Sequence, residues 1–238
     1  MNRFKPAPML ALTPVLLVIA VLTQLACAAH AATEGVVDLA GCQRLAESAP
    51  ALAIVQAKAW IERGGGEDAR LCQAAAQFHA GDFVKAGESF EALASGTVGR
   101  NARQVANLYN RAAWAWLRAG NAARAERLYS TAIEKQPDDG ELRIDRGIAR
   151  IEAKHFSGAA EDFSSVLRRQ PQRAEAYFYR ATAYKELGKN REALADIEQA
   201  LKLKPGDPDA QLLRGKVRSQ LSDVPSDRLG NPEHGGKP

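Results

Sequence analysis

A period of 34 residues in the second half of the chain constrains its fold more than any other feature of the sequence. Pro137, Pro171 and Pro205 stand 34 residues apart, and the segments that end at them align without gaps. These segments cover residues 106–137, 140–171 and 174–205. A constant period of this length indicates a repeat protein, in which each unit packs mainly against its neighbours.

The same kinds of residue recur at matching places in the three segments. A small residue stands near the middle of each first half, at Ala113, Gly147 and Ala181. An alanine and then a bulky residue follow in each second half, at Ala125 and Tyr129, Ala159 and Phe163, and Ala193 and Ile197. This pattern resembles the tetratricopeptide repeat, a helix-turn-helix unit of about 34 residues. The resemblance implies an all-α fold, a right-handed superhelical array in which small residues lie where the two helices of a unit cross.

Arginines replace the expected apolar residue at four places. Arg143 and Arg150 take bulky positions of the middle unit, and Arg146 and Arg180 stand where the family often has leucine. We expect a structural role for Arg146 and Arg180, with stems along apolar surface and head groups in water.

The turn inside the middle unit also departs from the pattern. Gly120 and Gly188 release the first helix of the outer units into a tight turn, whereas Lys154 takes this place in the middle unit. We therefore expect that turn to be built differently.

Less regular segments flank the three clear repeats. Residues 67–100 are expected to form a divergent unit. An N-terminal helical region (32–66) precedes it, with helices expected at 39–48 and 51–63 and a break at Pro50 between them. An amphipathic segment at 208–221 resembles the helix that caps such arrays, and residues 222–238 have the composition of a disordered tail. The clear units, with their linking turns, are assigned to 106–139, 140–173 and 174–207.

The first 31 residues have the layout of a secretory signal peptide. Arg3 and Lys5 precede an apolar run from Met9 to about Leu22, and small residues then favour cleavage after Ala31. Two alternatives stay open: the segment remains as an anchor, or Cys27 carries a lipid, although Gln24 stands where lipoprotein signals have leucine. The expected location is periplasmic or secreted, with no stable membrane insertion after cleavage.

Cysteine usage fits export. Cleavage after Ala31 removes Cys27 and leaves Cys42 and Cys72, which in an oxidising compartment are most simply a disulfide. Such a bond would stabilise the fold by about 3–4 kcal/mol in the chain-entropy account. Two buried free thiols are the alternative.

Charge and motifs point away from nucleic acid and from catalysis. The formal net charge of +4 falls to 4 − 2 = +2 once the two basic residues of positions 1–31 are removed, which is too weak for a nucleic-acid partner. The four histidines are scattered, and nucleophile, phosphate-loop, dinucleotide and metal-ligand motifs are missing from the sequence. We therefore predict no enzyme activity, no cofactor and no metal site.

The resemblance instead implies a partner-binding groove lined by the first helix of each unit. The groove-facing residues it predicts are Asn107, Asn110, Arg111, Trp114, Ile144, Asp145, Ile148, Phe178, Tyr179 and Thr182. Exposed aromatic residues there would anchor a partner, whereas Trp114 and Phe178 could alternatively pack against neighbouring helices. Trp114 and Tyr179 occupy two places of the clamp with which chaperone-tail-binding members hold a terminal carboxylate, so that ligand is not expected.

The sequence thus predicts a protein–protein interaction scaffold or adaptor of the bacterial cell envelope, a monomer or weak oligomer, with an unidentified protein or peptide partner. A lipid-anchored assembly factor, an accessory subunit or inhibitor of an envelope enzyme, and a cryptic hydrolase are the alternatives.

Overall fold

The computed structural model of the protein describes residues 38–96 and 99–222, and every regular element in these ranges is an α-helix. The helices are α2 (Leu39–Ser48), α3 (Pro50–Glu62), α4 (Gly66–His79), α5 (Phe83–Ser95), α6 (Ala102–Arg118), α7 (Ala122–Lys135), α8 (Gly140–Glu152), α9 (Phe156–Arg169), α10 (Ala174–Glu186), α11 (Asn190–Leu203) and α12 (Pro208–Ser222).

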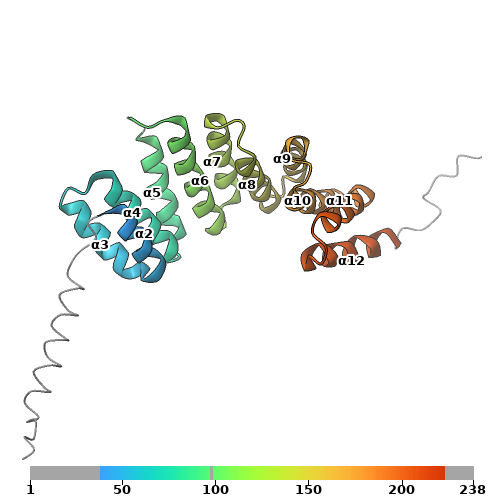
Figure 1. Cartoon of the computed structure of the whole chain (residues 1–238), viewed down its shortest axis with the longest axis horizontal. Coiled ribbons are helices and arrows are strands. Elements are labelled where there is room, and N and C mark those ends of the chain that lie inside the picture. Colours follow the sequence, from blue (N-terminus) through green and yellow to red (C-terminus); the bar gives the residue numbers. More distant parts are fainter. Residues whose placement is uncertain (1–37, 97–98, 223–238) are drawn as a thin grey trace, which may run out of the picture.

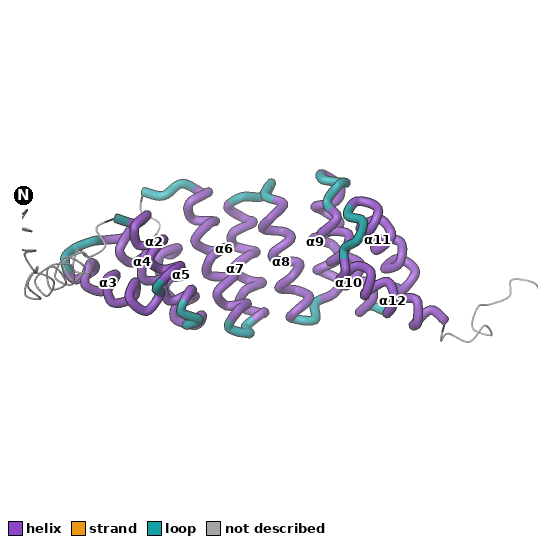
Figure 2. Tube along the Cα trace, turned by 60° about the horizontal axis from the view of Figure 1, so that its bottom comes forward, coloured by secondary structure: helices purple, strands orange, loops and turns teal. Residues whose placement is uncertain are grey.

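The helices form a single row of antiparallel neighbours, from α2 and α3 at one end to α12 at the other (Figure 1). Each helix packs against the next one in sequence, and the tube in Figure 2 shows the same order from a second direction. The three clear sequence units correspond to the pairs α6–α7, α8–α9 and α10–α11, and α4–α5 forms a further pair before them. The chain therefore folds as an all-helical superhelical repeat array.

Helix ends follow local sequence signals. Asn101 and Gln104 form a reciprocal capping box at the start of α6, and Asp139 accepts two backbone hydrogen bonds at the start of α8. Pro50, expected to separate two helices, is the first residue of α3, where its missing N–H costs no hydrogen bond. The helix expected at 39–48 is α2, and those expected at 51–63 and 208–221 differ from α3 and α12 by one residue at their ends.

The turn inside each unit is built alike, including the one at Lys154. The backbone has positive φ angles at Gly81 (81°), Gly120 (79°), Lys154 (61°) and Gly188 (72°). After each of these residues an amide returns to the first helix, as when His155 N donates to Arg150 O at 2.7 Å. The expectation of a different turn at Lys154 was wrong, because helix packing on both sides sets the turn geometry. A lysine held in this left-handed region costs about 1–2 kcal/mol.

Close approach explains the small residue at each helix crossing. A Cβ atom built on Gly147 would lie 2.5 Å from Cζ of Phe163, whose side chain is fully buried. The corresponding pairs, Ala113 with Tyr129 in the preceding unit and Ala181 with Ile197 in the following one, are also buried. The middle unit thus has glycine where its neighbours have alanine because the Phe163 ring fills the space of the methyl group.

Arg146 and Arg180 do not place their head groups in water. The guanidinium of Arg146 donates to both carboxylate oxygens of Asp162 (2.9 and 2.6 Å), and that of Arg180 does the same to Asp196 (2.7 and 2.7 Å). Asp162 is 4% and Asp196 6% exposed, so the expectation that the heads reach solvent was wrong, although the structural role holds. A carboxylate on the paired helix removes the need for hydration.

Arg150 is held in a similar way, which explains its place at a normally bulky position. Its Nε donates to Glu126 Oε1 and its Nη1 to Asp162 Oδ2, each at 2.8 Å. The middle unit therefore replaces an apolar contact between helices with an ion-pair network that spans α7, α8 and α9.

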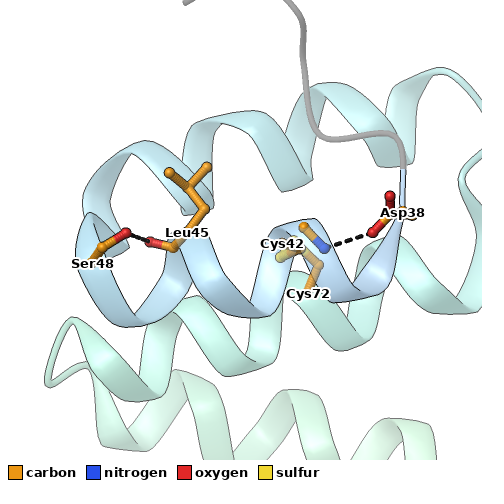
Figure 3. The surroundings of a disulfide bond; sticks show 6 residues. Asp38, Cys42, Leu45, Ser48 and Cys72 are labelled. Atoms are coloured by element: carbon orange, nitrogen blue, oxygen red, sulfur yellow. Dashed lines mark hydrogen bonds between the residues drawn. A yellow bond between two sulfur atoms is a disulfide. The ribbon is translucent and has the colours of Figure 1, made fainter.

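A disulfide joins Cys42 of α2 to Cys72 of α4, with the Cα atoms 5.7 Å apart (Figure 3). Both residues are fully buried against Ala57 and Trp60 of α3. The bond fixes the first helices of the row to the first repeat pair, the pairing favoured by the sequence over two free thiols.

Three expectations concern residues outside the described ranges: the signal peptide at 1–31, lipidation of Cys27 and disorder beyond Ser222. Within the ranges described, no helix combines the length and apolar character needed to cross a membrane.

Candidate functional site

The residues predicted to line a groove come from helices that are neighbours in space. The first helices α8 and α10 contact each other, as do α10 and α12, in addition to their contacts with the second helices between them. Helix α6 is connected to α8 through α7, which packs against both. The sides of α6, α8 and α10 that carry the predicted residues are referred to below as the first-helix face.

Trp114 is the most exposed aromatic side chain of this face. It lies on α6 with 41% of its surface accessible, one of the few large apolar residues of the described chain that are exposed to this extent. Phe178 behaves differently, since it is half-buried and packs against the cluster that contains Ile197 and Leu213. For both Trp114 and Phe178, packing against neighbouring helices was the alternative to a place in the groove. Phe178 packs in this way, and Trp114 stays exposed to solvent.

The other predicted residues of α6 lie beside Trp114. Asn107 is exposed and Asn110 is half-buried, so both amides have access to the surface. The Arg111 guanidinium lies 4.4 Å from the centre of the Phe90 ring, and burial lowers its pKa. Arg111 has no carboxylate within ion-pair distance among the described residues, so α6 offers the face an uncompensated positive charge.

Ile144 does not belong to the face. Its side chain is 2% exposed and packs with Phe163, Val166 and Ala176, so its prediction as a groove residue was wrong. The helical position places Ile144 on the side of α8 that meets the next unit. Ile148 packs half-buried against the same cluster, and the Thr182 hydroxyl donates to the Phe178 carbonyl at 3.0 Å within its own helix.

Asp145 of α8 is a half-buried carboxyl group with no ion pair or hydrogen bond in the described chain. Its pKa is raised to about 6, first by burial and then by the negative charges of Glu141, Glu175 and Asp139. The Tyr179 hydroxyl of α10 has a raised pKa for the same reasons, burial first and then Glu175, Asp209 and Asp145. The α8–α12 part of the face is therefore acidic, in contrast to α6.

A pocket of about 310 Å³ opens in this acidic part. Glu175, Phe178 and Tyr179 line it from α10, Ala200 and Lys204 from the end of α11, and Asp207, Asp209 and Ala210 from the start of α12. Tyr179 is fixed in place by stacking on Phe163, with ring centres 5.7 Å apart and an interplanar angle of 18°. Two predicted residues, Phe178 and Tyr179, thus form the aromatic wall of a cavity.

The sequence analysis missed three polar residues of this pocket, Lys204, Asp207 and Asp209. Lys204 and Asp207 belong to the turn that closes the last unit, and Asp209 belongs to the following helix, which was treated only as a cap. A signal was present, because Glu141, Glu175 and Asp209 follow one another at 34-residue spacing and therefore lie at one level on three successive first helices. A second, more open depression of about 620 Å³ lies between α9 and the turn after α10, away from the predicted residues.

The sequence matches a known family over this part of the chain. Models of the tetratricopeptide repeat match residues 110–174, 144–184 and 174–207. The chain contains tetratricopeptide repeats. The matched residues cover α7 to α11 and the second half of α6, so the first-helix face is built on these repeats.

Relatives share the repeats and not the whole protein. The chain is 34% identical over 98 residues to serine/threonine-protein phosphatase T of Trypanosoma brucei brucei, covering 39% of this chain and 21% of that protein. It is 31% identical over 121 residues to human tetratricopeptide repeat protein 16, covering 48% and 14% of the two chains. This chain thus spans about a fifth or less of the length of these curated relatives.

A solved structure agrees with the fold. A tetratricopeptide repeat protein from Parabacteroides merdae superposes with a TM-score of 0.63 and 18% identity, covering 73% of this chain and 67% of that one. This likeness extends the shared architecture beyond the repeats that the sequence alone matches.

Proposed function

We propose that this protein is an interaction scaffold that binds a segment of a partner protein along the first-helix face. The observation that carries the proposal is the exposed indole of Trp114 on α6. Large aromatic side chains left open on a rigid surface are the residues that most often anchor interfaces. Arg111 and Asn110 beside it supply a charge and an amide for polar contacts.

The rigidity of the array supports this role. Each first helix is held by packing on both sides, and the buried ion pairs at Arg146 and Arg180 fix the two helices of their units to each other. A preformed surface loses little conformational freedom when a partner binds, so the free energy of its contacts is retained as affinity.

Relatives support the interaction role and not a catalytic one. The phosphatase that matches this chain is covered over 21% of its length, so the similarity gives no reason to assign phosphatase activity here. The matched part consists of repeats, a fold that generally serves protein interaction.

We place the protein in the periplasm or outside the cell, as an adaptor of the bacterial cell envelope. Two features support this location: the signal-peptide layout of residues 1–31, and the Cys42–Cys72 disulfide, which fits an oxidising compartment. The proposal predicts that the protein isolated from an envelope fraction begins after Ala31. It therefore no longer contains Cys27, the residue that a lipid would modify, and mass spectrometry of the intact protein measures this.

Capture of a partner from an envelope extract tests the binding role. The immobilised protein is compared with Trp114→Ala and with the matched control Val84→Ala, which removes an equally exposed apolar side chain (48%) from α5, a second helix. We expect the partner to be retained by the wild type and the control and lost by Trp114→Ala. Equal retention by both variants would contradict a partner site at Trp114.

A further inference from the structure

We propose that the pocket between α10 and α12 binds an arginine or lysine side chain, so that the partner segment on the first-helix face is basic. The inference rests on the proposed function and goes beyond it, because it assigns the chemistry of the partner. Three features of the pocket and its surroundings carry it: carboxylates that outnumber the cations, an acidic surface next to the pocket, and an aromatic wall.

The carboxylates that line the pocket exceed the cations available to them. Lys204 is already paired with Asp207, with Nζ and Oδ2 2.8 Å apart. Glu175 is 3.3 Å from Arg173, outside the pocket lining, and Asp209 has no ion pair in the described chain. Counting the charged groups of the lining, three carboxylates face one ammonium, so an incoming cation would meet a net negative surface.

The acidic surface continues from the pocket toward α8. Arg173 forms an ion pair with Glu141, with Nη1 and Oε1 2.5 Å apart. Asp145 has no ion pair of its own, and the negative charges of Glu141 and Glu175 act on it. The fully buried Tyr129 lies within electrostatic reach of Asp145, and its hydroxyl has no hydrogen-bond partner in the described ranges. A cation above α8 would therefore find a carboxylate that no protein group neutralises.

Aromatic rings form the wall next to these carboxylates. Phe178 and Tyr179 meet edge to face with ring centres 5.3 Å apart, and stacking on Phe163 fixes Tyr179. A cation over such a ring is attracted by the negative face of the ring quadrupole. A planar guanidinium can use the ring and a carboxylate at once, so we expect arginine to bind more tightly than lysine.

Other occupants fit less well. In the part of the chain that the structure describes, no three acidic, histidine or cysteine side chains are placed to hold a metal ion. An acidic peptide tail would meet Glu175, Asp209 and Asp145, and like charges brought together cost affinity.

Peptide titrations followed by NMR of the isotope-labelled protein test the inference. The probe is a blocked pentapeptide with one central arginine among glycine and serine, and the comparison peptides have citrulline or glutamate in its place. We expect saturable shifts at Phe178, Tyr179 and the start of α12 for the arginine peptide, with a Kd of about 1 mM. The citrulline and glutamate peptides should cause no shifts there.

Two double variants with equal net charge separate a specific pocket from a general charge effect. Glu175→Gln with Asp209→Asn removes two charges from the pocket, and Glu47→Gln with Glu88→Gln removes two exposed charges from α2 and α5. The pocket variant should bind the arginine peptide about fivefold or more weakly, and the control within about twofold of wild type. Circular dichroism checks that both variants keep the helical fold.

Shifts located elsewhere, equal shifts with citrulline, or equal losses in both variants would each overturn the inference. These outcomes leave the proposed function standing if Trp114→Ala still loses the partner. If Trp114→Ala retains the partner while the pocket still binds the arginine peptide, the proposed function alone would be overturned.

Discussion

Arg146 and Asp162 form a buried bidentate ion pair that joins the two helices of the middle unit. The third donor of Arg146 reaches Ser130 of the preceding unit, with Nη1 and Oγ 3.2 Å apart. The next unit repeats the arrangement 34 residues later with Arg180, Asp196 and Ser164, where the last contact is 3.0 Å. The array is therefore tied together by a polar link that has the same period as the repeat.

Removal of one partner of this link should be costly. Asp162→Ala leaves the Arg146 guanidinium without its carboxylate and Arg150 with Glu126 alone, and we expect the free energy of unfolding to fall by about 3–5 kcal/mol. Urea denaturation followed by circular dichroism measures this change. Asp138→Ala, which breaks the exposed Asp138–Arg169 pair, should leave the unfolding midpoint unchanged. Similar midpoints for the two variants would contradict a structural role for the buried pair.

The glycine at the middle helix crossing should resist substitution. In Gly147→Ala the new methyl group meets the buried Phe163 ring, and we expect a loss of about 1–3 kcal/mol despite the better helix propensity of alanine. Gly215→Ala on α12 is the matched control, because nothing lies within 4 Å of its Cβ position. The control should gain up to about 1 kcal/mol. Adding Phe163→Ile to Gly147→Ala copies the Ala181–Ile197 pair and should recover part of the loss, and no recovery would count against the steric explanation.

Replacing Lys154 by glycine should increase the stability of the protein. Its φ of 61° is costly for a residue with a Cβ atom, so we expect Lys154→Gly to raise the free energy of unfolding by about 0.5–1 kcal/mol. Gly120→Ala, at the matching turn of the preceding unit, should lower it. Thermal denaturation of the two variants gives the comparison, and a destabilised Lys154→Gly would mean that the lysine side chain contributes more than its backbone strain costs.

Most of the architecture was predictable because the 34-residue period of small and bulky residues is a local signal. The same pattern predicted the helix pairs, the crossing residues and the tight turns at Gly120 and Gly188. It failed at Lys154 because packing on both sides of a turn can impose a conformation that the residue itself disfavours. It failed for Arg146 because the partner, Asp162, lies on another helix and no rule of spacing within one helix relates them.

The candidate site was less predictable than the fold. Trp114, Phe178 and Tyr179 follow from the resemblance, but the packing of Ile144 depends on how far α8 is rotated against the next unit. The pocket is lined in part by Asp209 of the terminal helix α12, so it forms only at the junction between the last unit and α12. The periodic recurrence of acidic residues along the first helices is the one sequence signal that points to it.

The raised pKa of Asp145 predicts a pH-dependent stability. Its pKa is about 6 in the fold against an ordinary 3.8, because burial and the charges of Glu141, Glu175 and Asp139 disfavour the ionised form. Its contribution to stability is therefore fully present below pH 3.8 and is lost as the pH rises through about 6.

Asp145→Asn removes this titration. We expect the variant to exceed wild type by about 1–3 kcal/mol near pH 8 and to match it near pH 3.5. Urea denaturation at the two pH values measures the difference. A constant difference between variant and wild type across this range would show that Asp145 titrates normally.

The most direct test of the account places a photo-crosslinking residue in the protein and asks which positions capture the partner. Position 107 on α6 and position 182 on α10 sample the first-helix face without replacing Trp114 or Tyr179, and position 84 on α5 is exposed away from it. The account predicts crosslinks to one and the same protein at 107 and 182 and none at 84. Crosslinks at 84 alone, or to different proteins at the three positions in proportion to their exposure, would contradict binding along the first-helix face.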